Sequence, residues 1–134
     1  MHDLNWLAII VAAVSAFVLG GIWYGPLFKN AWCREAGIDP DAKPKSHPAK
    51  TFAIAFVASL IAAYGFAMFL HISNSGPELW KSVHAGLMVG FFYVAMSFGI
   101  NYAFAGRSFK LWAIDAGYHI LQFCLYGLIL GLWH

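Results

Sequence analysis

Four long apolar runs constrain this chain of 134 residues more than any other feature. The runs extend over about residues 4–24, 52–72, 83–104 and 111–133. A helix needs about 20 apolar residues to cross the hydrocarbon core of a bilayer. Hydrophobic residues make up 61% of the chain and charged residues only 10%, which is too few charges to cover a domain in water. The sequence therefore predicts an all-α integral membrane protein with four transmembrane helices.

The connections between the runs predict how these helices are arranged. Two connections are short, so consecutive helices are expected to be antiparallel neighbours in a single bundle that spans residues 1–134. The connection at residues 25–50 is long, and Gly25-Pro26 is expected to end the first span. Its second half is not expected to be a continuous helix, because it contains Pro40, Pro44 and Pro48.

The first half of this long connection carries a helical pattern. Apolar residues recur at helical spacing from Leu27 to Trp32, polar residues fill most of the remaining positions, and Gly37 is a plausible helix stop. The pattern predicts a short helix that lies in the membrane interface. The alternative interpretation is a solvated loop.

Lysine and arginine residues predict the orientation. Seven of them fall on one side of the membrane and only Lys81 on the other, and cytoplasmic loops carry the excess of positive charge. The long connection is therefore expected in the cytoplasm, with both termini outside. The seven are Lys29, Arg34, Lys43, Lys45, Lys50, Arg107 and Lys110.

Small residues spaced about four apart form a stripe on every span. Such stripes let helix backbones approach closely in lipid, where no hydrophobic force drives helices together. We interpret them as packing surfaces within one chain, and the alternative is that some of them form an oligomer interface. The stripes are Ala8, Ala12, Ala16 and Gly20; Ala55, Ser59, Ala63 and Ala67; Gly86, Gly90, Ala95, Gly99 and Ala103; and Gly127 and Gly131.

Polar residues within the spans gather near the predicted cytoplasmic end. Asp115 and His119 are four residues apart on one helix face, where their side chains can meet. A carboxylate turned towards lipid is costly, so Asp115 is expected to face the bundle interior. We expect it to contact at least one of His119, Asn101, Arg107 or Tyr24, with Tyr118 at a similar depth. This polar cluster is either a lock that ties helices together or a proton or ligand site.

Catalytic and metal-binding signatures are weak. The sequence contains none of the motifs HExxH and GxSxG or a phosphate-binding glycine loop, so we expect neither an enzyme nor a cofactor. Nucleic acid is not an expected partner, because the net charge is only +2. Four histidines fall near the predicted outer face, but their spacing matches no standard metal site. They are weak candidates only: His2, His71, His84 and His134.

Several motifs resemble a family of small bacterial membrane proteins of unknown function. The first half carries Asn5-Trp6-Leu7, then Trp23-Tyr24-Gly25-Pro26-Leu27-Phe28 and Trp32. The second half carries Asn101-Tyr102, Phe104, Arg107, Leu111, Ile114 and Gly117-Tyr118-His119. The resemblance implies a four-helix membrane protein of the bacterial inner membrane without an assigned activity. Its recurrent polar positions correspond here to Asn101, Arg107, Asp115 and Tyr118.

Three functions remain open from the sequence. The first is a non-enzymatic accessory subunit or a self-assembling membrane component, with lipid and copies of itself or a larger complex as partners. The second is an oligomeric transporter, channel or small-ligand binder that uses Asp115, His119 and Asn101. The third is a metal-dependent membrane enzyme that uses the outer histidines.

Overall fold

The computed structural model describes residues 4–39, 48–73 and 78–133, and this part of the chain is helical and contains no strand. Segments η1 and η2 are π-helical turns that continue the helices before them. The predicted all-α fold is confirmed. In chain order the elements are α1 (Trp6–Ile22), η1 (Trp23–Leu27), α2 (Lys29–Ala36), α3 (Pro48–Ser73), α4 (Leu79–Met88), η2 (Val89–Ala95), α5 (Met96–Ala105) and α6 (Phe109–Leu132).

Among the described residues, four helices are long and apolar enough to cross a membrane. They extend over Trp6–Leu27, Ala49–Ser73, Leu79–Ala105 and Phe109–Leu132. The predicted spans are confirmed in number and order, but three of the helices begin before their predicted runs. The apolar criterion misses these first turns because they contain polar or aromatic residues. The chain is therefore a multi-pass membrane protein.

The prediction that Gly25-Pro26 ends the first helix is wrong. The helix continues through η1 to Leu27, and Pro26 lies inside this π-helical turn. The amide of Phe28 donates to the carbonyl oxygen of Trp23 at 2.9 Å, which is a π-helical bond across five residues. Proline lacks an amide hydrogen and crowds the preceding turn of an α-helix, whereas a wider turn accommodates it.

The long connection forms the predicted short helix. Helix α2 covers Lys29–Ala36 and ends at Gly37, whose φ of 74° is left-handed, as predicted for a helix stop. The predicted loop is shorter than expected, because α3 already begins at Pro48. Proline is tolerated in the first turn of a helix, where its missing amide hydrogen would have had no partner.

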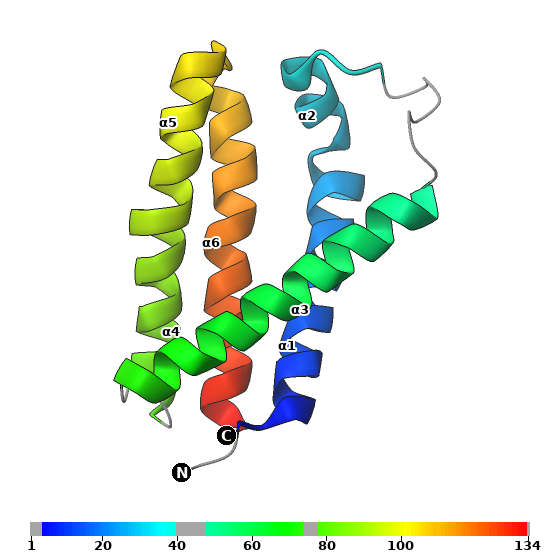
Figure 1. Ribbon diagram of the computed structural model, residues 1–134. Coiled ribbons are helices and arrows are strands. Elements are labelled where there is room, and N and C mark those ends of the chain that lie inside the picture. The colour runs from blue at the N-terminus through cyan, green and yellow to red at the C-terminus, as the bar shows by residue number, and fades with distance from the viewer. Residues whose placement is uncertain (1–3, 40–47, 74–77, 134) are drawn as a thin grey trace.

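The spans are arranged as a three-helix layer that a fourth helix crosses (Figure 1). The rod formed by α4, η2 and α5 lies beside α6, and α6 lies beside α1. Helix α3 runs obliquely over this layer and packs mainly against α1. One end of the bundle holds the start of α1, the end of α3, the start of α4 and the end of α6. Helix α2 and the connection from α5 to α6 lie at the other end.

Small residues make these contacts close. Ala8, Ala12 and Ala16 of α1 are fully buried. A Cβ atom added to Gly90 of η2 would lie 2.7 Å from the Cα of Ile120 on α6, so the two backbones are in contact there. The interpretation of the stripes as packing within one chain is confirmed at these positions. Other stripe members lie buried as well: Ser59, Ala63, Ala67, Gly86, Ala95, Gly127 and Gly131.

Candidate functional site

The carboxylate of Asp115 is the centre of a polar cluster at the end of the bundle that carries α2. Asp115 lies on α6 with only 8% of its surface exposed. Its Oδ1 accepts hydrogen bonds from the hydroxyl of Tyr24 at 2.6 Å and from the indole Nε1 of Trp32 at 2.9 Å. Its Oδ2 accepts a hydrogen bond from the hydroxyl of Tyr102. We call these four residues the carboxylate cluster.

The cluster confirms part of the sequence prediction. Asp115 faces the interior and contacts Tyr24, one of its four expected partners. Arg107 instead donates to the carbonyl oxygen of Ala36 at 3.1 Å. In the part of the chain that the structure describes, no hydrogen bond joins Asp115 to Arg107, Asn101 or His119. The carboxylate therefore accepts from neutral donors that come from η1, α2 and α5.

Two further aromatic side chains hold these donors in place. The indole of Trp23 donates to the carbonyl oxygen of Ile114 at 2.9 Å, which fixes η1 against α6. The hydroxyl of Tyr118 donates to the carbonyl oxygen of Ala16 at 2.9 Å, which fixes α6 against α1. The ring of Tyr118 also packs edge-on against Tyr24, with centroids 5.6 Å apart. Tyr118 thus supports the cluster through a ring contact.

His119 belongs to a second polar chain deeper in the bundle. Its Nδ1 lies 2.5 Å from Oε1 of Gln122, and Nε2 of Gln122 donates to the hydroxyl of Tyr126 at 2.8 Å. That hydroxyl lies 2.7 Å from Oγ of Ser59, which donates to the carbonyl oxygen of Ala13 at 3.1 Å. The chain therefore connects α6 with α3 and α1.

Two kinds of hydrogen-bond partner are not predicted from the sequence. Trp32 is predicted only as an apolar position of the short interfacial helix and as part of the family motif, although its indole is a donor that can bind a buried carboxylate. Gln122 and Tyr126 were not singled out, although the first lies three residues after His119 and the second four residues after the first. This spacing places all three on one face of α6 and was a usable signal.

The remaining candidates lie apart from both clusters. Asn101 is exposed on α5, and its side chain makes no hydrogen bond among the described residues. His71 and His84 are exposed on α3 and α4, and the described ranges contain no group of three side chains that could bind a metal. His2 and His134 lie outside the described residues.

The carboxylate cluster fits a structural role. Hydrogen bonds to a charged group contribute about 1.5–3 kcal/mol each, and the three here join η1, α2 and α5 to α6. Among the described residues, no buried polar side-chain atom lacks a hydrogen-bond partner. The cluster therefore joins η1, α2 and α5 to α6 at one end of the bundle through a single carboxylate.

The fold and the cluster define a small helical membrane protein, with four spans in the part of the chain that the structure describes. Residues 7–131 match the sequence model of a family described as a protein of unknown function, DUF1761. The chain belongs to this family, and the resemblance to an uncharacterised family is confirmed. No curated protein and no solved structure matches the chain.

Proposed function

We propose that this protein is a non-enzymatic component of the bacterial inner membrane that works by assembling, as a homo-oligomer or as a subunit of a larger membrane complex. The main observation behind the proposal is the exposed side chain of Asn101. This carboxamide lies within the third span, four residues before the last residue of α5. At a rise of about 1.5 Å per residue it is about 6 Å inside the end of the helix.

Among the described residues, the side-chain amide of Asn101 has no hydrogen-bond partner within its own bundle. The neighbouring surface is apolar, because Ile100 is 61% exposed and Phe104 is 91% exposed. A polar group in an apolar surrounding is stabilised by a hydrogen bond, and asparagine side chains commonly pair across transmembrane helices. A second subunit against α5 would supply that bond.

The carboxylate cluster supports the non-enzymatic part of the proposal. Asp115 is the acidic residue inside the four spans, and its two oxygens accept from three donors of the same chain. A group held in this way joins structural elements and is not presented to a substrate.

Variants of α5 test the assembly. In Asn101→Leu we expect the fraction of chemically cross-linked oligomer in native membranes to fall several-fold, because interhelical bonds of this kind contribute about 0.6–2 kcal/mol. Ile100→Leu is the matched control, because its side chain is also exposed on α5 but is apolar. Equal cross-linking of wild type and Asn101→Leu would refute the role of Asn101.

The orientation is part of the same proposal. Lys29 and Arg34 belong to α2, and Arg107 and Lys110 belong to the connection from α5 to α6 and the first turn of α6, at the same end of the bundle. Lys50 belongs to the first turn of α3. Lys81 belongs to the opposite end, near both termini. Positive charge collects on the cytoplasmic side, so we place the end of the bundle that carries α2 on the cytoplasmic side and both termini outside.

A ligand or proton site at Asp115 is the second candidate. It is favoured by one observation: among the described residues this carboxylate accepts from neutral donors and pairs with no cation. Asp115→Asn separates the two roles, because the amide keeps one acceptor oxygen but carries no charge. In the assembly role the variant stays folded and oligomeric, whereas in the ligand role any activity assigned to the protein is lost.

A further inference from the structure

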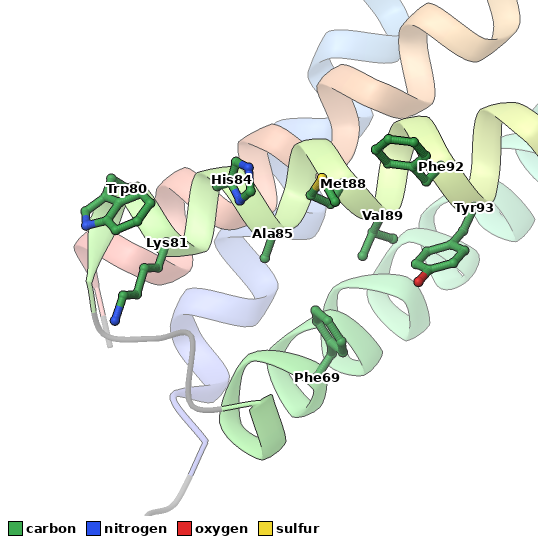
Figure 2. A pocket seen from close by; sticks show the side chains of 9 residues that line it. All are labelled: Phe69, Trp80, Lys81, His84, Ala85, Met88, Val89, Phe92 and Tyr93. Atoms are coloured by element: carbon green, nitrogen blue, oxygen red, sulfur yellow. The ribbon is translucent and has the colours of Figure 1, made fainter.

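A groove lies between α3 and the rod formed by α4 and η2 (Figure 2). Its volume is about 740 Å³, and its walls are largely apolar, with Phe69 on one side and Met88, Val89 and Phe92 on the other. Trp80, Lys81 and His84 lie at the end of the groove nearest the start of α4. We propose that this groove binds the acyl chain of one anionic phospholipid, with the headgroup phosphate at Lys81.

The length of the groove matches an acyl chain within one leaflet. Lys81 and Phe92 are eleven residues apart on a nearly continuous helix, which is about 16 Å at 1.5 Å per residue. One leaflet contributes about 15 Å to a hydrocarbon core of about 30 Å. A chain that begins at Lys81 therefore ends near Phe92, close to the middle of the membrane.

The volume is compatible with a lipid chain. At about 740 Å³ the groove lies within the range of about 300–1,000 Å³ that is typical of sites for small ligands.

Polarity changes along the groove as it does along a phospholipid. Trp80 and Lys81 lie in the first turn of α4, where tryptophan rings and lysine side chains prefer the headgroup region. Nζ of Lys81 lies 3.5 Å from the carboxylate of Glu78, and the lysine side chain is 44% exposed. An ammonium group has three donors, so this contact leaves two for a phosphate.

The π-helical turn η2 supplies the deep end of the groove. It contributes Val89, Phe92 and Tyr93, and Figure 2 shows the Tyr93 ring directed towards α3. A π-helical turn changes the direction of the side chains that follow it, and such turns occur frequently at functional sites. The backbone irregularity and the groove therefore coincide in the third span.

Native mass spectrometry of the intact protein tests the proposal. The probe is phosphatidylglycerol, a minor component of phosphatidylcholine nanodiscs. We expect one phosphatidylglycerol to stay bound to each wild-type chain. Met88→Trp should reduce this bound population about tenfold or more, because Met88 lines the groove and the larger ring fills it. Leu87→Trp is the matched control, since Leu87 is also exposed on α4 but does not line the groove.

The headgroup assignment has its own variant. Lys81→Gln should lower the preference for phosphatidylglycerol over phosphatidylcholine about fivefold, which is the effect of one lysine near an anionic surface. Lys110→Gln, at the opposite end of the bundle, should leave the preference unchanged.

Three results would overturn the proposal. Equal lipid retention in Met88→Trp and Leu87→Trp would mean that the groove holds no lipid. An unchanged headgroup preference in Lys81→Gln would remove the phosphate from Lys81. Loss of subunits instead of lipid in Met88→Trp would assign the groove to a second copy of the chain. Circular dichroism and elution as a single species confirm that each variant compared is folded.

Discussion

Replacing Gly86 by alanine perturbs a close contact between the backbones of α4 and α6. Gly86 lies on α4 against the backbone of Phe123 on α6, and an added Cβ would overlap the carbonyl oxygen of Phe123 and lie 2.7 Å from its carbonyl carbon. Carbon atoms in ordinary contact are about 3.5–4.0 Å apart, so the helices must separate by about 1 Å. Overpacking of this kind costs about 1–3 kcal/mol.

The assay is thermal unfolding in a mild detergent, followed by the helical circular dichroism signal. We expect Gly86→Ala to lower the Tm by several degrees, as about 1–3 kcal/mol does in a small domain. Gly65→Ala is the control, because Gly65 lies on α3 and an added Cβ meets no atom within 4 Å. Alanine favours a helix by up to about 1 kcal/mol over glycine, so this control should keep or raise the Tm. Because both substitutions gain the same helix propensity, equal Tm values for Gly86→Ala and Gly65→Ala would refute the close approach of α4 and α6.

Three further predictions concern the polar clusters and the orientation. Asp115→Leu leaves the donors of Tyr24, Trp32 and Tyr102 without their acceptor, so the free energy of unfolding should fall by about 3–5 kcal/mol. It should fall by clearly less in Asp115→Asn, and an equal fall in both variants would argue against the carboxylate cluster as a lock. Tyr126→Phe removes the hydroxyl between Gln122 and Ser59 and should cost about 1–3 kcal/mol in the same assay, whereas Tyr64→Phe on the exposed face of α3 should cost little. A reporter fused after His134 should be active only if it works outside the cytoplasm, and cytoplasmic activity would reverse the proposed orientation.

The sequence predicted the spans because their signal is local. Each span is an apolar run long enough to cross the bilayer. Such a run forms a helix in lipid, because the backbone groups must then make their hydrogen bonds within the segment. The end of the first span was missed at Pro26, because the π-helical turn that accommodates this proline has no simple composition signal. The end of a helix close to a proline therefore follows from the backbone conformation and not from the sequence pattern alone.

The candidate site was predicted only in part. The depth of Asp115 and its cost in lipid were enough to predict an interior position and the contact with Tyr24. Its pairing with His119 was expected from spacing along one helix, but the structure pairs His119 with Gln122 three residues further on. Spacing on a helix permits both pairs, and the choice depends on donors from other elements, which a single sequence does not place. Trp32 is such a donor.

The number of subunits in the native membrane tests the central claim most directly. Nanodiscs cut from the membrane by an amphipathic polymer, without detergent, keep existing assemblies together, and single-molecule photobleaching of a labelled chain counts the copies in each disc. At low protein density we predict two or more copies per disc for wild type, or one copy together with a constant partner protein. The account further predicts fewer copies for Asn101→Leu. Discs that contain one copy and no other protein would contradict it.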